Sequence, residues 1–450
     1  MIGEKVYHKI YGIGTVTGEL HKGLELLIRF PNGSERQIRS DYVTLVSPAR
    51  TVPVSSSQTK FDTGQFYARM MIEAFRLGVV PYGKVDQFTF GRDTEIDTVK
   101  KWLCQDNSGP LIIEGTYGTG KSHFIDYIFA WALNNGYAVV KTDLDPHTCP
   151  PYRPKQVYSQ LTKSFRFKKA NKTANLRDFL RAATNIGDKN ENLIYLNDVL
   201  FALKHYPENP IIWDWIEGQS SGPAWIGDGY YNCVLPSLNN VGTASNIYCH
   251  ILSELAWIAT NHLNLKGFLI LLDEGESAAY SGYARTQTNQ GWSFIQGLMA
   301  LSANDIRLKN EPINRSYGEA GGRYFGEQTG LIYSGHDTYV RYCLNSLSDI
   351  KVVFSFTEVQ GLSNWLKDKK IPNTSIQMNP LSEEAQRVIF NQICLLYQSA
   401  FQSKQITDSE AYLEKIHEKC NDGIRQFIKG SVEVLDIKRS NPTINVEQIE

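Results

Sequence analysis

The sequence lacks several features that would each have fixed a broad class of protein. No apolar run approaches the roughly 18 residues that a membrane-spanning helix needs, and MIGEKVYHKIYG has none of the apolar stretch of a signal peptide. The seven cysteines are scattered without a Cys-x-x-Cys pair, which argues against zinc or disulfides and favours a reducing cytoplasm. The formal net charge is only −1, so a globally basic nucleic-acid-binding protein is excluded and any such contact must be local.

What is present is an ordinary globular composition. Of the 450 residues, 42% are hydrophobic and 21% are charged, which predicts about two or three domains with at least one sizeable core. Changes in composition divide the chain into four predicted parts. They are a small β unit over 1–47, a linker rich in Ser, Pro and Thr over 48–62, an α/β core over 63–380, and a helical region with a polar tail over 381–450.

The predicted core is organised around a glycine-rich loop. An apolar run, 111–113, predicts a buried strand before the loop, and Phe124 and Ile128 lie at helical spacing after it. The intervening GTYGTGKS fits a phosphate-binding P-loop, in which glycines let backbone N–H groups converge on phosphate oxygens. We expect Lys121 to reach the β- and γ-phosphates and the Ser122 hydroxyl to ligate Mg²⁺. The predicted nucleotide-binding residues of this segment are Gly115, Thr116, Tyr117, Gly118, Thr119, Gly120, Lys121, Ser122 and His123.

A second apolar strand carries acidic residues. The run 268–272 is apolar at every position, as in a strand buried on both faces of a parallel sheet, and Asp273 and Glu274 follow it. Ligands bind at the carboxyl ends of such strands, so both acids should lie beside the loop. We expect Asp273 to hold Mg²⁺ through water and Glu274 to polarise the attacking water as a general base. Loop and acids together predict an ATPase, and Glu276 is a further acid of unassigned role.

The first part of the chain has short strand-like runs. They lie at 5–8, 14–20, 24–30 and 35–39, with glycine and Pro-Asn-Gly turns between them, and their spacing fits a small SH3-like barrel. VYHKIYGIGTV followed by LLIRF resembles the Tudor-like modules of UvrD-type helicases and CarD-type transcription factors. That resemblance implies a module that binds a protein partner, often RNA polymerase. The alternative is a unit that only caps and stabilises the next domain.

A basic stretch follows the loop. Residues 153–181 contain nine basic residues against one acid, Asp178, with Phe165 and Phe167 between them. This stretch is the best local candidate for contact with a nucleic-acid backbone, whereas the alternative is an ordinary solvated surface. Its basic residues are Arg153, Lys155, Lys163, Arg166, Lys168, Lys169, Lys172, Arg177 and Arg181.

Over about residues 66–438 the chain resembles the P-loop ATP-binding proteins (component D) of BREX-type phage-defence clusters. The motifs that carry the resemblance, in order, are FRLGVVP, FTFGRDTEID, GTYGTGKSHFIDY, TDLDP, WDWIEG, the Asp-Glu pair, PLSEEA and IRQFIKGSVEVLDI. Those proteins are AAA+ ATPases on the ORC/Cdc6 and STAND side. The resemblance implies an AAA+ core with a C-terminal helical lid, working beside a helicase or another DNA-processing enzyme in antiviral defence. The N-terminal module, the segment 280–335 and the isoleucine before Arg425 depart from the family pattern.

The resemblance also implies roles for residues outside the two motifs. In AAA+ ATPases a turn like GRDTE holds the adenine, which assigns Val80 and Arg92 to the base, with a simple capped helix start as the alternative. Thr357, at the end of the apolar strand 351–356, would sense the γ-phosphate. Arg425 would reach the nucleotide from the lid, unless it is a surface residue. Candidates for an arginine supplied in trans are Arg285, Arg315 and Arg323.

Three functions remain open at this point. The first is a DNA-associated AAA+ ATPase that loads, moves or switches a partner. The second is a STAND-like switch, in which ATP binding drives oligomerisation and turnover is slow. The third is a transcription-linked factor whose N-terminal module contacts RNA polymerase or a helicase. All three predict ATP and Mg²⁺ as ligands of a cytoplasmic protein.

Overall fold

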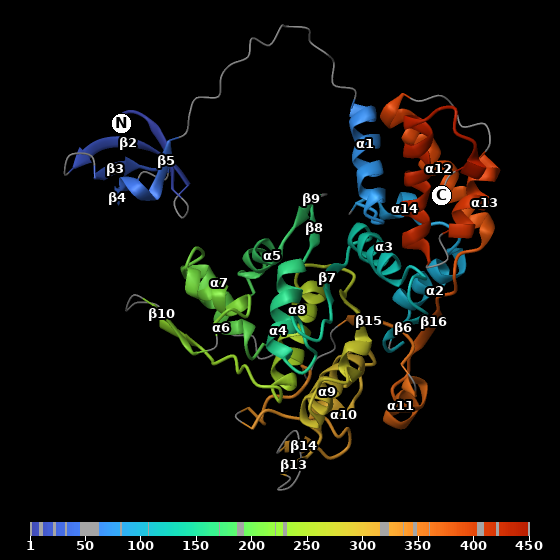
Figure 1. The fold of residues 1–450 in the computed structure, drawn as a ribbon. Helices are drawn as coiled ribbons and strands as arrows, with labels where there is room; N and C mark the ends of the chain where they lie inside the picture. Colours follow the sequence, from blue (N-terminus) through green and yellow to red (C-terminus); the bar gives the residue numbers. More distant parts are fainter. Residues whose placement is uncertain are drawn as a thin grey trace. The chain divides into compact units, whose positions relative to one another are not determined.

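A computed structural model describes most of the chain (Figure 1). The described residues are 2–8, 12–20, 24–31, 34–45, 63–81, 83–106, 108–170, 172–186, 193–220, 222–227, 232–315, 324–335, 337–344, 349–359, 361–402, 409–419 and 423–448. The chain divides into two compact units, 1–61 and 62–450, and each is described by itself.

The described part of the first unit is an antiparallel sheet of five strands in the order β4-β3-β2-β1-β5. Leu26 and Ile28 alternate with more exposed neighbours along β3 and pack with Val6, Val16 and Phe30 in a small core. The four predicted strands are present, and β5 adds a fifth. The strands are β1 (Lys5–His8), β2 (Gly12–Leu20), β3 (Glu25–Arg29), β4 (Glu35–Arg39) and β5 (Val43–Leu45).

The second unit is built on a parallel sheet of five strands in the order β16-β6-β15-β12-β7. β12 and β15 are buried along their whole length, which explains why residues 268–272 are all apolar and why β15 is apolar except at Lys351 and Ser355. Because all five strands run the same way, their carboxyl ends meet at one edge of the sheet. The strands are β6 (Leu111–Glu114), β7 (Ala138–Asp143), β12 (Phe268–Asp273), β15 (Ile350–Phe356) and β16 (Thr374–Gln377).

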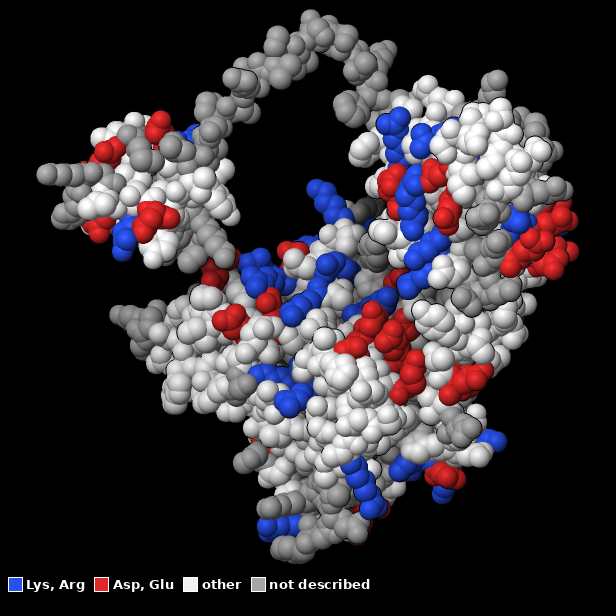
Figure 2. All heavy atoms as spheres, viewed as in Figure 1, with Lys and Arg blue, Asp and Glu red and all other residues white. Residues whose placement is uncertain are grey.

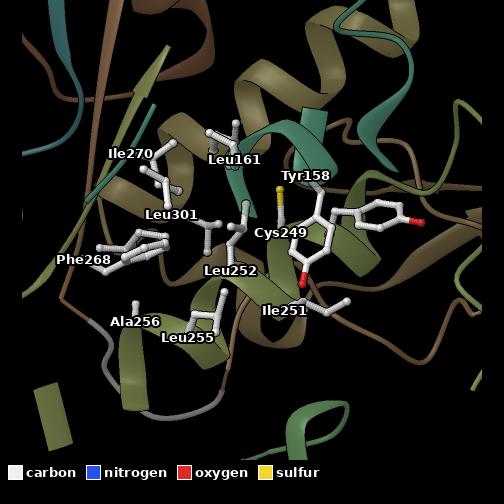
Figure 3. Close-up of a cluster of buried hydrophobic side chains, with 14 of the residues drawn as sticks. Tyr158, Leu161, Cys249, Ile251, Leu252, Leu255, Ala256, Phe268, Ile270 and Leu301 are labelled. Carbon is white, nitrogen blue, oxygen red and sulfur yellow. The ribbon is translucent and has the colours of Figure 1, made fainter. Parts of the chain in front are cut away.

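Helices cover both faces of this sheet, which makes the unit a mixed α/β fold. Ile113 and Leu269 point to the face covered by α2 and α3, whereas Ile112, Phe268 and Ile270 point to the face covered by α4, α8 and α9. Figure 3 shows side chains of α4 and α8 gathered around Phe268 and Ile270. The helices are α2 (Asp93–Leu103), α3 (Lys121–Asn134), α4 (Pro154–Ser164), α8 (Ser245–Asn261) and α9 (Arg285–Ser302).

The long connection from β7 to β12 forms a further layer. Trp213 and Trp215 are core residues of this layer, at 3% and 0% exposed. An isolated bridge from Val139 to Arg166 attaches this layer to β7, which is an edge strand of the sheet. Besides α4 and α8 the connection contains β8 (Phe167–Lys169), β9 (Lys172–Ala174), α5 (Leu176–Ala183), α6 (Leu196–His205), α7 (Pro210–Ile216), β10 (Ala224–Gly227) and β11 (Asn232–Leu235).

A second apolar cluster joins the C-terminal helices to α1, which comes before the sheet in the sequence. Asp436 of α14 accepts hydrogen bonds from Arg76 Nη2 of α1 at 2.9 Å and from the Tyr397 hydroxyl of α12 at 2.6 Å. The Ser382 side chain caps α12 by accepting from the N–H of Ala385. The helices are α1 (Thr63–Arg76), α12 (Glu383–Phe401), α13 (Ser409–Lys419) and α14 (Ile424–Ser440).

Smaller elements complete the second unit. They are the helices η3 (Val85–Phe88), η4 (Gly275–Ala279), α10 (Arg307–Asn310), α11 (Leu362–Lys369) and η5 (Val446–Gln448), with the strands β13 (Ile313–Arg315) and β14 (Tyr324–Gly326). In the first unit, η2 (Ser40–Tyr42) lies between β4 and β5. Across the described residues, no helix is both long and apolar enough to cross a membrane.

Candidate functional site

The glycine-rich loop connects β6 to α3 at the carboxyl edge of the sheet. Gly118 and Gly120 have φ angles of +83° and +92°, a region that side chains with a β-carbon rarely adopt. The loop therefore needs glycine at these two positions. Lys121 begins α3 and is only 9% exposed, and its Nζ donates to the carbonyls of Gly115 at 2.7 Å and Thr116 at 3.0 Å. The ammonium group is thus held inside the curve of the loop.

Four carboxylates influence the pKa of Lys121. Desolvation lowers the pKa of Lys121, while Glu276, Asp273, Glu358 and Glu274 act in the opposite direction. Asp273 ends β12, Glu274 and Glu276 follow it, and Glu358 follows β15; the carboxyl ends of both strands share one edge of the sheet with the loop. The sheet therefore brings Lys121 and the predicted acids Asp273 and Glu274 together, although they are more than a hundred residues apart in the sequence.

Asp273 is the last residue of β12 and is 3% exposed. One of its carboxylate oxygens accepts from the Ser355 hydroxyl and, at 3.0 Å, from the N–H of Glu274. Ser355 lies on β15, the strand between β6 and β12, so its hydroxyl reaches the acid from the neighbouring strand. The hydroxyl fixes one carboxylate oxygen of Asp273.

Glu274 differs from Asp273 in its environment. It is exposed and has a φ of +57°, which turns the chain sharply away from β12 into η4. Desolvation raises the pKa of Glu274, and the neighbouring charge of Asp273 raises it further. A carboxylate with a raised pKa is a better proton acceptor than an ordinary glutamate, which suits a general base.

Two residues at this edge have partners that the sequence did not indicate. Ser355 was not predicted as a site residue; the only signal was one hydroxyl in the otherwise apolar run VVFSF. Glu276 was left without a role, and its Oε2 accepts from the N–H of Thr357 at 3.0 Å. Glu276 thereby ties the end of β15 to η4, which positions the backbone of the predicted sensor Thr357.

The residues predicted to hold the base have structural contacts as well. Arg92 is 6% exposed, and its Nη2 donates to the carbonyls of Thr119 at 2.7 Å and Asn379 at 2.8 Å. Its Nη1 lies 3.0 Å from Glu95. Arg92 therefore braces the glycine-rich loop from outside, with its guanidinium group directed at protein oxygens.

His123 and Val80, two further residues predicted to bind the nucleotide, also have contacts within the protein. The ring Nε2 of His123 is 2.9 Å from the Thr89 hydroxyl, and burial lowers the pKa of His123. Val80 packs against the apolar cluster of α1, α12 and α14. Contact of either residue with a nucleotide stays a prediction.

The start of α14 meets the loop. The N–H of Ile424 donates to the Gly118 carbonyl at 3.0 Å, and Gly423, with a φ of +93°, packs directly on the Gly118 backbone. The next residue, Arg425, is exposed, and its stem passes over Gly78. The helical region therefore touches the loop through backbone atoms, while the role predicted for the Arg425 side chain stays a prediction. Of the candidates for an arginine in trans, Arg323 lies outside the described residues.

The donors at this edge fit Mg²⁺ bound together with a phosphate. Within the described ranges, no group of three or more His, Cys, Asp or Glu could hold a metal ion alone. Mg²⁺ usually takes one or two protein oxygens and completes its shell with water and substrate phosphates. Exposed Ser122 and the fixed carboxylate of Asp273 are oxygen ligands of the required kind.

Comparisons with known proteins give one family match. Residues 66–183, from α1 to α5, match the family model described as BREX system ATP-binding protein BrxC/D. A search of curated proteins found no match. Among solved structures, NtrX from Brucella abortus is 11% identical with a TM-score of 0.31, and the alignment covers 84% of this chain and 55% of that one. The same protein in complex with ATP gives 10% identity, a TM-score of 0.32, and coverages of 84% and 57%.

Proposed function

We propose that the protein is an ATPase of the AAA+ type that works with other components of an antiphage defence system. The observation that carries the proposal is the buried Lys121 inside a glycine-rich loop, facing the acids that follow β12 and β15. A loop of this kind binds phosphate through backbone N–H groups, and a cation beside acids is the arrangement that phosphoryl transfer uses. The match of residues 66–183 to the BrxC/D model supports the assignment to defence.

Each residue of the site has a distinct part in the proposed reaction. Lys121 binds the β- and γ-phosphates of ATP. The phosphate oxygens then replace the Gly115 and Thr116 carbonyls as acceptors of its hydrogen bonds. Ser122 and Asp273 would hold Mg²⁺, which neutralises phosphate charge when bound. Glu274 orients a water molecule and takes its proton. Thr357 borders the γ-phosphate, because β15 ends between the loop and the acids.

Ser355→Ala tests the hydroxyl that fixes Asp273. We expect the Mg²⁺ concentration for half-maximal ATP hydrolysis to rise about tenfold or more, because a partner that orients a metal ligand typically controls metal affinity by about 10–100-fold. The measurement is the hydrolysis rate at saturating ATP over a Mg²⁺ series. Ser363→Ala, at an exposed position of α11, is the matched control. If both variants reach half-maximal hydrolysis at the same Mg²⁺ concentration as the natural chain, the role assigned to Ser355 is wrong.

A STAND-like switch is the second candidate, and the contact between Ile424 and Gly118 favours it, because it joins the helical region to the loop. The deciding experiment measures ATP turnover and particle mass on the same sample, with and without ATP. Steady turnover supports the ATPase that drives a partner. Negligible turnover with ATP-dependent assembly supports the switch. Failure to bind ATP would contradict both.

We also propose that the first unit is a Tudor-like, SH3-type module for a protein partner such as a helicase or RNA polymerase. In its favour, the unit has its own apolar core and leaves Tyr7, Ile13 and Tyr42 48%, 48% and 64% exposed. A chain without residues 1–50 should therefore keep the ATP hydrolysis rate of the full chain and lose a partner in a pull-down from host extract. A large loss of hydrolysis, or an unchanged set of captured proteins, would contradict this assignment.

A further inference from the structure

Eight of the nine basic residues of 153–181 separate into two groups, of which the first serves the fold; the ninth, Arg153, lies over the ring of Tyr152. Lys155 is buried and its Nζ donates to the Ser220 carbonyl at 2.5 Å. Arg177 and Arg181 bond Glu217 and Glu208 at 2.7 and 2.8 Å, and both guanidinium groups lie over the ring of Trp213. These three cations hold the layer between β7 and β12 together. The sequence interpretation of all nine as one phosphate-binding stretch is therefore too broad.

The second group lies beside β7, the edge strand of the sheet, and we call it the basic edge. It consists of Lys163, Arg166, Lys168, Lys169 and Lys172, together with Lys266 from the turn before β12. Lys163 and Arg166 line a hollow at the carboxyl end of β7, beside Gln160 and Ser164. Lys168 and Lys266 line another at its amino end, beside Asn134 and Asn135. Figure 2 shows Lys and Arg side chains gathered over α5, β8 and β9 on the visible face.

The cations of the basic edge outnumber the acids beside them. Asp126 and Asp143 line the hollow at the carboxyl end of β7, where the single cation of Lys141 pairs with both acids at 2.8 and 3.8 Å. Within the part of the chain that the structure describes, none of the five lysines of the basic edge forms an ion pair. The strip is therefore positive in a protein whose formal net charge is −1.

The β8–β9 hairpin keeps an unfavourable pairing of charges. Lys169 and Lys172 are directly opposite each other in its register. Like charges in directly opposed positions destabilise a β-ribbon, and a hairpin of two short strands has little stability to lose. The connection also contains Ala170 at a φ of +48°, which is unfavourable for alanine. An anionic partner would remove the repulsion between the two lysines.

We propose that the basic edge binds the phosphate backbone of duplex DNA, with the β8–β9 hairpin at the groove. Phosphate contacts use Lys and Arg together with Asn, Gln and Ser, and all five residue types lie along this strip. The centre of a protein–protein interface is instead enriched in aromatic residues and depleted of lysine. No large hydrophobic residue of the strip is exposed among the described residues. A two-stranded β-ribbon also fits the major groove of B-DNA.

The test measures binding of the full chain to a labelled duplex oligonucleotide by fluorescence anisotropy over a salt series. Replacing both hairpin lysines, Lys169→Gln with Lys172→Gln, should weaken binding about tenfold or more and reduce the salt slope of log K by about 2, since each lost phosphate contact removes about 0.9. The double variant Lys163→Gln with Lys266→Gln should weaken binding and reduce the salt slope by similar amounts. The matched control is Lys100→Gln with Lys101→Gln on α2, which packs beside β16 at the opposite edge of the sheet.

ATP hydrolysis without DNA should be unchanged in all three double variants, which separates this proposal from the proposed ATPase function. An equal loss of DNA binding in the control pair would overturn the proposal. So would a chain that does not bind the duplex, or a complex that poly-L-glutamate displaces as efficiently as unlabelled duplex does. The last outcome would identify an acidic protein as the partner.

Discussion

Lys121→Ala is expected to lower the affinity for ATP about 10–100-fold. A charge-assisted hydrogen bond contributes about 1.5–3 kcal/mol and each 1.4 kcal/mol changes affinity tenfold, so one lost lysine–phosphate contact accounts for this effect. The loop holds the ammonium group 2.7 Å from the Gly115 carbonyl and 3.0 Å from the Thr116 carbonyl, within the curve where a phosphate would lie. The measurement is equilibrium binding of a fluorescent ATP analogue.

The loss should be specific to this position. Lys100→Ala, on the exposed side of α2, removes the same charge away from the loop and should leave the affinity unchanged. A circular dichroism spectrum equal to that of the natural chain establishes that the variant folds. Normal affinity in a folded Lys121→Ala protein would show that GTYGTGKS does not bind phosphate.

Glu274→Gln is expected to reduce ATP hydrolysis about 100–10,000-fold while ATP binding is nearly retained, which is the range for loss of a positioned general base. The amide has almost the same shape as the carboxylate but cannot take a proton from water. Asp273 keeps its bond to Ser355 in this variant, so the proposed Mg²⁺ ligand stays in position. Phosphate release and nucleotide binding should be measured on the same preparation.

A neighbouring acid supplies the control for Glu274. Glu358 is exposed, and its charge also raises the pKa of Lys121. Glu358→Gln therefore changes the local electrostatics without removing the proposed base. It should change hydrolysis far less than Glu274→Gln does. Equal effects of the two variants, or parallel loss of ATP binding, would mean that Glu274 acts through charge alone.

The pH dependence gives a second readout for Glu274. Burial, and then the charge of Asp273, raise the pKa of this carboxyl above its ordinary value of 4.5. A general base works in its deprotonated form, so the rate should fall as the pH decreases through this raised pKa. The decline should therefore begin at a higher pH than an ordinary glutamate would give. Glu274→Gln should lack this acid limb.

Contiguous patterns predicted the elements of the core well. The runs 111–113 and 268–272 became β6 and β12 because a strand buried on both faces must be apolar at every position. Ser355 was missed because its meaning depends on Asp273, 82 positions away, and on the order of strands in the sheet. A lone serine in an apolar run carries no information about which strand lies beside it.

The basic stretch 153–181 shows that the roles of charged residues are equally hard to predict from the sequence alone. Arg177 and Arg181 cannot be told apart from Lys169 and Lys172 by composition. They differ only through distant partners, since Glu217 and Glu208 lie 40 and 27 positions from the arginines that they bind. Arg92 is similar, because the Asn379 carbonyl that it contacts is 287 positions away. Such partners become visible only once the chain is folded.

The hydrogen bond from Ile424 to Gly118 has a thermodynamic consequence. It makes the loop and the first turn of α14 one linked system, and α14 shares its apolar cluster with α1 and α12. Linkage is reciprocal: if ATP changes the stability of this contact by some factor, then holding the contact changes ATP affinity by the same factor. If a protein bound the outer faces of α1 or α12 and changed this contact, it would change nucleotide affinity without approaching the phosphates. In the opposite direction, nucleotide binding would change the affinity of those faces for that protein by the same factor.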